Sequence, residues 1–373
     1  MAIDFRVTHT DAGTSARLGA LTLSRGVEIA TPAFMPVGTK GAVKSLSPDE
    51  VHDLGYGMIL CNAYHLYLRP GHELIRGLGG LHRFMNWHGG ILTDSGGYQI
   101  FSLAALRKVT DEGVEFRSHI DGSIHFFTPE KSIEVQASLG CDIAVCLDDV
   151  VGYPVEKSAA AAAVKRTTDW AKRCVVAQKR VDPPLFGIVQ GSTFPELRAQ
   201  SAEALVSLDL DGYAIGGLSV GEPTEEMLRV LETTTPLLPP HLPRYLMGVG
   251  TPLDIFDAVV RGIDLFDCVL PTRNARNGML FTSNGRMNIR NARYRDDPRP
   301  VDPECACGLC SKYSRAYLRH LFQEKEIYAH RLASLHNLSY YSNTMRDIRH
   351  AIAAGTLSTL YTRLQAETEE RDD

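Results

Sequence analysis

Two aspartates stand in surroundings that suit a carboxylate for chemistry. Asp267 lies within the apolar run Leu265-Phe266-Asp267-Cys268-Val269-Leu270, where an unpaired carboxylate is costly to bury. Asp94 opens the segment Asp94-Ser95-Gly96-Gly97-Tyr98-Gln99, whose glycines let the backbone approach a ligand and whose tyrosine can stack on a planar base. A carboxylate nucleophile beside a second carboxylate that serves as acid and base is the arrangement of retaining glycosyl transfer. A structural ion pair is the alternative for Asp267.

Other polar groups could read the edge of a purine. Asp148 offers an acceptor and Gln190 offers both a donor and an acceptor, each at the end of an apolar run. The segment Gly216-Gly217-Leu218 adds backbone groups that are free for the same task. Together these groups predict a pocket for a base.

A cysteine cluster predicts a metal site. The run Cys305-Ala306-Cys307-Gly308-Leu309-Cys310 places three thiols within six residues, a spacing that suits tetrahedral Zn²⁺. We expect His336 to be the fourth ligand, with His320 and His330 as competitors. Four protein ligands leave no open position, so the predicted Zn²⁺ is structural, one per subunit.

The elements that must position these groups are short apolar runs, each ending at a polar residue or a glycine. They cover residues 33–37, 58–62, 91–94, 142–148, 185–190, 213–217, 245–250 and 265–270. Because they lack strict alternation, they are typical of strands buried on both faces. Segments with helical patterns lie between them, from Ser47 onward and at 156–179, 195–208 and 251–261. This order predicts an α/β fold, the (β/α)₈ TIM barrel, with a doubly wound sheet as the alternative.

In a barrel the polar strand ends would gather at the carboxyl-terminal face, where barrel enzymes keep their chemistry. We expect residues 1–373 to form one TIM-barrel domain, with a zinc- and RNA-binding insertion from 272 to about 335 after the eighth strand, closed by His336. This insertion contains a basic stretch, with seven arginines against two aspartates between Pro271 and Pro300. We also expect a hairpin over 114–126 and strands over the barrel bottom in the first thirty residues.

Composition excludes several classes of protein. The chain is 44% hydrophobic and 22% charged, as in ordinary globular proteins, and it lacks a run of 18 uncharged apolar residues. Its first residues lack the layout of a secretory signal, and eight scattered cysteines do not make a disulfide scaffold. These features predict a cytoplasmic protein without a membrane partner.

The motifs resemble those of the tRNA-guanine transglycosylase (queuine tRNA-ribosyltransferase) family, in its bacterial type. The resemblance runs in order from about residue 5 to 365. The segments that carry it are Asp94-Ser95-Gly96-Gly97-Tyr98-Gln99, Gly216-Gly217-Leu218, Phe266-Asp267-Cys268-Val269-Leu270-Pro271-Thr272-Arg273 and the cysteine run with His336.

The resemblance implies a double displacement on RNA. Asp267 would attack C1′ of guanosine 34 in the anticodon and hold the ribose as a covalent ester. Asp94 would be the general acid/base for the departing guanine and for the incoming 7-deazaguanine. The implied base pocket comprises Asp94, Ser95, Gly96, Gly97, Tyr98, Asp148, Gln190, Gly217, Leu218 and Met247. The implied RNA contacts are Gly248, Val249, Gly250, Thr251, Pro252, Leu253, Asp254, Thr272, Arg273, Asn274, Ala275 and Arg276.

The implied partners are tRNAs with a G-U-N anticodon (Asp, Asn, His, Tyr) and a second copy of the chain, with the zinc subdomain in the dimer interface. For the incoming base, some residues favour queuine and others favour its precursor. Asp148-Asp149-Val150-Val151 resembles eukaryotic catalytic subunits, which take queuine, whereas Val220 stands where those subunits have glycine. Val220 leaves less room for the cyclopentenediol of queuine, so we favour the aminomethyl precursor preQ1, with queuine as the alternative.

Two other functions compete with this interpretation. A noncatalytic tRNA-binding subunit of a transglycosylase complex would need neither Asp94 nor Asp267. A barrel glycoside hydrolase usually presents several aromatic platforms, but the only tryptophans, Trp87 and Trp170, do not lie at expected strand ends.

Overall fold

Parallel strands form the centre of the molecule. The computed structural model describes residues 3–103, 106–179, 181 and 183–368. Six strands pair in parallel, in the spatial order β10 (Ala144–Val145), β11 (Leu185–Val189), β12 (Gly212–Ile215), β13 (Arg244–Leu246), β14 (Leu265–Cys268) and β4 (Ala33–Pro36). A separate parallel pair consists of β5 (Met58–Cys61) and β6 (Gly90–Thr93). The predicted α/β class is confirmed, and the structure shows a curled parallel sheet.

A continuous ladder of eight strands is not seen in the described residues. Single parallel bridges, Val37 to Leu60 and Leu92 to Ile143, connect the pair to the two edges of the larger sheet. At the second junction a glutamine side chain takes the place of backbone bonds. The Gln136 amide accepts from the Val145 nitrogen and donates to the Val145 carbonyl, both at 2.9 Å. Because the Gln136 side chain occupies both backbone groups of Val145, β10 is shorter than the predicted strand over 142–148.

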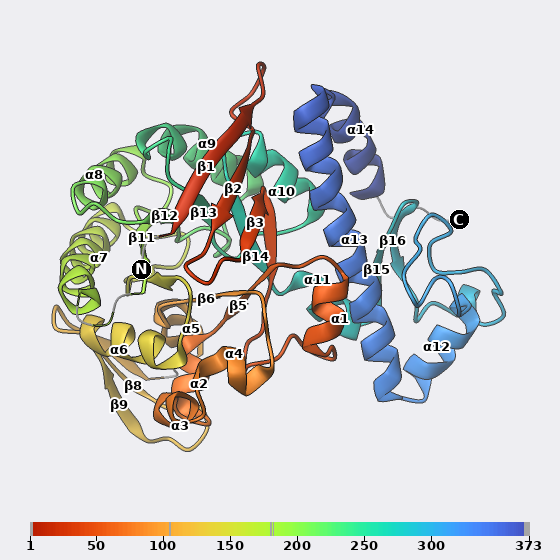
Figure 1. Cartoon of the computed structure of the whole chain (residues 1–373), viewed down its shortest axis with the longest axis horizontal. Coiled ribbons are helices and arrows are strands. Elements are labelled where there is room, and N and C mark those ends of the chain that lie inside the picture. The colour runs from red at the N-terminus through yellow and green to blue at the C-terminus, as the bar shows by residue number, and fades with distance from the viewer. Residues whose placement is uncertain (1–2, 104–105, 180, 182, 369–373) are drawn as a thin grey trace.

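Helices cover the outside of these strands (Figure 1). The longer ones that follow strands are α6 (Pro129–Leu139), α7 (Lys157–Gln178), α8 (Pro195–Val206), α9 (Thr224–Thr234) and α10 (Pro252–Val259). Shorter helices are α1 (Pro48–Asp53), α2 (Ala63–Leu68), α3 (His72–Gly77), α4 (Gly80–Met85) and α5 (Gly97–Leu103), with a 3₁₀ turn at Thr235–Leu237. Helix α1 begins at the expected Ser47 cap, where Ser47 and Glu50 form a capping box.

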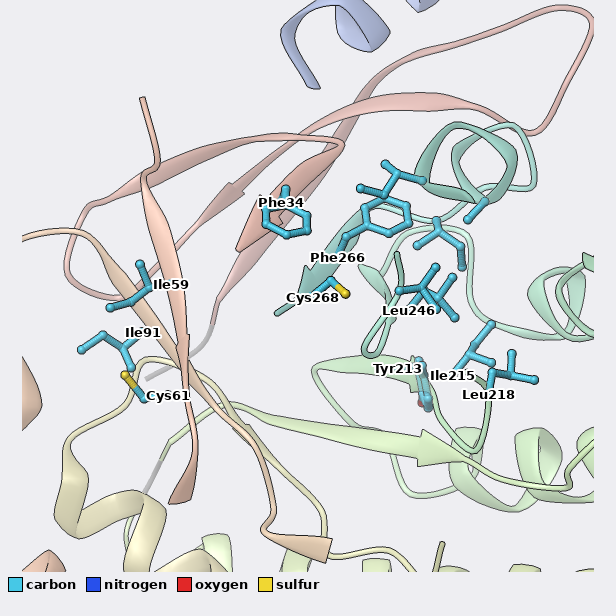
Figure 2. Packing of buried hydrophobic residues seen from close by; sticks show 14 of the residues in the cluster. Phe34, Ile59, Cys61, Ile91, Tyr213, Ile215, Leu218, Leu246, Phe266 and Cys268 are labelled. Atoms are coloured by element: carbon cyan, nitrogen blue, oxygen red, sulfur yellow. The ribbon is translucent and has the colours of Figure 1, made fainter. Parts of the chain in front are cut away.

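Alternation along each strand separates two layers of the core. On β14, Phe266 packs toward the helices, in the layer that Figure 2 shows with Phe34, Ile59 and Ile215. Leu265 belongs instead to the inner cluster, which it shares with inward residues of the other strands. Because side chains alternate faces with a period of two, Asp267 shares the inner face with Leu265. The strand pattern therefore directs this carboxylate into the centre of the curled sheet.

Two antiparallel sheets flank the parallel strands. The first comprises β1 (Asp4–Thr10), β2 (Arg17–Thr22) and β3 (Glu28–Thr31), and Arg17 pairs with Asp264 just before β14 at 2.6 Å. This contact places the sheet at the amino ends of the strands, as predicted for the first thirty residues. The second comprises β7 (Arg107–Val109), β8 (Val114–Arg117) and β9 (Ile124–Phe127). It contains the expected hairpin and adds a third strand.

The C-terminal elements contain a smaller core. They are α11 (Leu270–Arg276), β15 (Met279–Thr282), β16 (Gly285–Asn288), a 3₁₀ turn at Ala292–Tyr294, α12 (Arg315–Gln323), α13 (Ile327–Ala354) and α14 (Leu357–Thr368). Leu280, Ile289, Val301 and Leu318 are among the buried residues of this smaller core, although α14 and the second half of α13 pack against the main core. Figure 1 shows β15, β16 and α12 on the side of α13 away from the parallel strands. Among the described helices, none is both long and apolar enough to cross a membrane.

Candidate active site

Asp94 lies directly after β6 and is held by three donors. It is 6% exposed. Its carboxylate accepts hydrogen bonds from the Asn62 side chain, from the Ala63 backbone at 2.9 Å and from Gln99 Nε2 at 2.8 Å. Asn62 and Ala63 follow the neighbouring strand β5, so donors at the end of β5 hold the carboxylate at the end of β6. Asn62 and Gln99 were not among the predicted site residues, although Asn62 was one of the polar strand ends.

The environment of Asp94 shifts its proton affinity. The pKa of Asp94 is raised to about 6. Burial is the largest cause and the negative charge of Asp267 adds to it, whereas the three hydrogen bonds lower the pKa. A carboxyl that titrates near neutral pH can both give and take a proton during a reaction. Asp94 is therefore suited to general acid/base chemistry.

Asp267 is held on one oxygen only. The hydroxyl of Tyr245, on the adjacent strand β13, donates to Oδ1 at 2.5 Å, and the Gly248 nitrogen donates to the same atom at 2.8 Å. Burial raises the pKa of Asp267, and these two bonds lower it, with no cation among the groups that act on it. A structural ion pair, the alternative for this residue, is therefore not what its surroundings provide. Its second oxygen accepts no hydrogen bond from any described residue.

Asp148 and Gln190 form a buried polar pair. Gln190 Nε2 donates to Asp148 Oδ2 at 2.7 Å, and Ser95 Oγ donates to Oδ1 at 3.1 Å. Burial raises the pKa of Asp148 to about 6, and the bonds from Gln190 and Ser95 oppose this effect. Gln190 Oε1 is buried and has no hydrogen-bond partner among the described residues. An unpaired buried acceptor is costly, so this oxygen would gain from a donor that a ligand supplies.

Two glycines make room for this pair. A Cβ on Gly97 would lie 2.5 Å from Asp148 Oδ1, and a Cβ on Gly217 would collide with Gln190 Oε1. Gly217 also has φ +64°, a conformation that glycine adopts without strain. The glycine motifs of the sequence are thus explained by close backbone approach to the polar pair.

One cavity of about 530 Å³ joins these groups. The predicted base-pocket residues that line it are Asp94, Ser95, Tyr98, Asp148, Gly217, Leu218 and Met247. Asp267 lines the same cavity, whereas Gly96, Gly97 and Gln190 are not among its lining residues. Tyr98 is 49% exposed at its edge, where its ring is free to stack on a base. His65, Glu222 and Tyr245 also line the cavity and were not among the predicted site residues.

The predicted RNA-binding residues divide into two groups. Those that line the cavity are Gly248, Val249, Gly250, Asp254 and Arg273. Those that do not are Thr251, Pro252, Leu253, Thr272, Asn274, Ala275 and Arg276. Pro252 is buried in α10, and Thr272 and Ala275 are buried in α11, which does not suit direct contact with RNA. Asp254 caps its own helix by accepting from the Thr251 backbone at 2.9 Å.

The cysteine cluster closes around one histidine. The sulfur atoms of Cys305, Cys307 and Cys310 and a ring nitrogen of His336 all lie within 4.8 Å of one another. His336 Nδ1 lies 3.5 Å from Cys307 Sγ and 3.3 Å from Cys310 Sγ, and Nε2 donates to the Phe281 carbonyl at 2.7 Å. Such a second bond fixes the ring so that Nδ1 faces the ligand position. The arrangement is consistent with a structural metal site.

His320 and His330 are not members of this cluster. His320 is exposed, and His330 packs against Phe322 with ring centroids 5.8 Å apart. The preference for His336 among the three histidines therefore agrees with the geometry.

The helix that contains His336 also contacts the segment that follows Asp267. Asn337, next to His336, donates to the carbonyls of Pro271 and Met279 at 3.0 Å each and accepts from the Phe281 nitrogen at 3.2 Å. The cysteine cluster thus supports the position of α11, which begins three residues after Asp267.

Comparison with known proteins agrees with the site. The family model described as queuine tRNA-ribosyltransferase matches residues 11–370. A queuine tRNA-ribosyltransferase of Pelotomaculum thermopropionicum is 57% identical over 357 residues, which cover 96% of each chain. One of Desulforamulus reducens is 55% identical over 94% of this chain and 95% of its own, and one of Halothermothrix orenii is 53% identical over 96% and 95%. The chain belongs to the queuine tRNA-ribosyltransferase family.

Proposed function

We propose that this chain exchanges guanine 34 in tRNAs with a G-U-N anticodon (Asp, Asn, His, Tyr) for a 7-deazaguanine, by double displacement. The observation that carries the proposal is that two buried aspartates, from the ends of β6 and β14, line one cavity beside a polar pair suited to a purine. Family membership supplies the reaction class, guanine exchange in the queuosine pathway.

In the first displacement, Asp267 is the nucleophile. A carboxylate oxygen of Asp267 forms a bond to C1′ of the ribose while the bond from C1′ to N9 of guanine breaks. The bonds from Tyr245 and Gly248 to Oδ1 hold the carboxylate, and Oδ2, without a partner among the described residues, is the oxygen we assign to the attack. Asp94 gives its proton to the departing guanine, so the base leaves neutral.

In the second displacement, Asp94 has become a carboxylate and takes the N9 proton of the incoming base. N9 then attacks C1′ and the ester bond to Asp267 breaks. A pKa of about 6 suits a carboxyl that must give a proton in one step and take it in the next. Asp148, Gln190 and the Gly217 backbone hold both bases in turn.

For the incoming base we favour preQ1. Val150 and Val220 both line the cavity, and Val220 precedes Glu222, which accepts from the Val220 nitrogen at 3.0 Å. A fixed branched side chain at this wall leaves less room for the larger substituent of queuine.

For the architecture we propose a closed (β/α)₈ barrel, residues 1–373 as one domain, and an insertion over 272–335 that His336 closes. The two parallel bridges at the edges of the six-stranded sheet support closure, since they bring β5 and β6 between β4 and β10. The separate buried cluster around Leu280 and Leu318 supports an insertion with its own core.

For the metal we propose one structural Zn²⁺ per subunit. Three thiolates and one imidazole are a preferred donor set for Zn²⁺, and they leave no position for substrate. This ion would take no part in the chemistry and would hold α13 against the segment from Pro271 to Phe281.

For the partner we propose a homodimer formed near the cysteine cluster. Tyr313 and Tyr317 stack at 5.2 Å, and Tyr313 and Tyr328 share a hydrogen bond at 3.0 Å. Ile327 beside them is 81% exposed. Exposed aromatic and branched side chains in one place are typical of protein interfaces.

The test is incorporation of labelled guanine into G-U-N tRNAs, with the same tRNAs carrying adenine at position 34 as the control. We expect incorporation into the first set only. No incorporation by the folded, metal-loaded protein would favour the alternative, a noncatalytic tRNA-binding subunit. The presence of both aspartates in one cavity counts against that alternative.

A further inference from the structure

Arg198, on α8 behind the sheet, is a buried cation whose guanidinium donates, among the described residues, to carbonyl groups alone. The residue is 0% exposed. Its guanidinium donates to Val189 and Ser192 carbonyls at 2.8 Å each, to Gly216 at 2.7 Å and to Gly217 at 3.5 Å. Burial lowers the pKa of Arg198 to about 9, which leaves it charged at neutral pH. Among the described residues it forms no ion pair with a carboxylate.

These carbonyls belong to the ends of two neighbouring strands. Val189 ends β11 and directly precedes Gln190, while Gly216 and Gly217 follow β12. The backbone ladder between these strands ends at the pair Val189 and Ile215. The Gly216 nitrogen still donates to the Val189 carbonyl at 3.1 Å, and beyond this bond the Arg198 guanidinium adds bonds to the carbonyls of Gly216 and Gly217.

The two segments meet again at the base pocket. Gln190 Oε1 lies so close to Gly217 that a Cβ there would collide with it. A relative shift of the strand ends would therefore change the spacing between the Gln190 amide and the Gly217 backbone. A planar fork with five donors can hold several carbonyls in fixed directions, which the single ammonium of lysine cannot do.

We propose that Arg198 is a positioning residue that sets the spacing between Gln190 and Gly217 and thereby the affinity of the pocket for the base. This inference rests on the proposed function, because it assigns base recognition to that pair. Arg198 acts through the backbone and touches no substrate.

Kinetics of guanine exchange test the proposal, with Arg198→Met, Arg198→Lys and Arg244→Met as variants. Arg244 is the matched control, since it is also buried and donates to the carbonyls of Leu238 and Gly262, but at the start of β13. Both Met variants should lose thermal stability, because each leaves buried carbonyls unpaired.

We expect Arg198→Met to raise the KM for guanine by about tenfold or more, with the KM for tRNA changed by less than about twofold. Arg198→Lys should lie between wild type and Arg198→Met, and Arg244→Met should keep the guanine KM of wild type. A general loss of stability would not separate the two KM values in this way.

An unchanged guanine KM in folded Arg198→Met would overturn the proposal, and so would an equal rise in Arg244→Met. If Arg198→Met does not fold, Arg198→Lys decides, since a guanine KM equal to that of wild type would contradict the need for the fork. Absence of exchange by wild type is a different result, because it rejects the proposed function itself.

Discussion

The hydroxyl of Tyr245 donates a 2.5 Å hydrogen bond to Oδ1 of Asp267, across two adjacent parallel strands. Both side chains point to the inner face of the curled sheet, and the carboxylate and the phenol are buried. The bond lowers the pKa of Asp267 against the raising effect of burial. It therefore favours the ionised form, which is the form a nucleophile needs.

Removal of this bond should slow the reaction most at acid pH. In Tyr245→Phe the pKa of Asp267 rises further, so the acid limb of the kcat profile should move to higher pH. We expect kcat at neutral pH to fall by about 10- to 100-fold, the value of one hydrogen bond to a charged group. Tyr213→Phe is the control, since Tyr213 is buried on β12 but outside the cavity. A profile that keeps its acid limb would refute this role of Tyr245.

Asp94→Asn should remove the acid/base without removing the nucleophile. The amide cannot protonate guanine or deprotonate the incoming base, so kcat should fall by about 10²- to 10⁴-fold. The tRNA should still bind with nearly the affinity of wild type, as measured by filter binding. Retention of more than about a tenth of the wild-type kcat would contradict the role assigned here.

The raised pKa of Asp94 also predicts how stability depends on pH. Its folded pKa of about 6 lies above its ordinary value of 3.8, so its contribution to stability is complete below pH 3.8 and is lost as pH rises through 6. Between pH 4 and 8, the free energy of unfolding of Asp94→Asn should gain about 2 kcal/mol relative to wild type. Urea unfolding at both pH values measures this difference, and a constant difference would argue against the raised pKa.

Loss of a cluster ligand should remove the metal. We expect His336→Ala and Cys307→Ala to bind no zinc, to melt at lower temperature and to lose tRNA affinity, because the helix from His336 also supports Pro271 through Asn337. His320→Ala, at an exposed histidine outside the cluster, should keep one zinc per chain. Elemental analysis of the purified variants decides between these outcomes, and full zinc content in His336→Ala would exclude it as a ligand.

Val220→Gly should widen the choice of base. We expect the ratio of kcat/KM for queuine to that for preQ1 to rise by about tenfold or more, since removal of the branched side chain frees space beside the pocket. Competition assays with both bases measure this ratio. The same ratio in variant and wild type would mean that another part of the wall, such as Val150, selects the base.

The sequence predicted the parts of the molecule in which unusual residues stand in an unusual local pattern. Asp267 in an apolar strand, Asp94 in a glycine-rich turn and three closely spaced cysteines are unusual patterns, and the structure brings each of them into a cluster. The choice of His336 was harder, because His320 and His330 also follow the cysteines. Its burial beside the Phe281 carbonyl has no signal in the sequence.

The residues on surrounding helices that bond the backbone of the strand ends could not be predicted in this way. Gln136 and Arg198 lie on helices, where glutamine and arginine are ordinary residues, yet both reach strand carbonyls. Their roles depend on long-range packing, which a local pattern does not contain. Pro252 and Ala275 lay within predicted RNA-binding segments, but each is buried against the fold rather than toward the cavity.

The most direct test of the account is a comparison of wild type with Asp267→Ala in guanine exchange, with the covalent tRNA complex followed on a denaturing gel. The account predicts labelled guanine in the tRNA and a complex that survives denaturation for wild type, and neither for the variant. Incorporation of guanine by folded Asp267→Ala would contradict the central claim, because base exchange would then proceed without the carboxylate assigned to C1′.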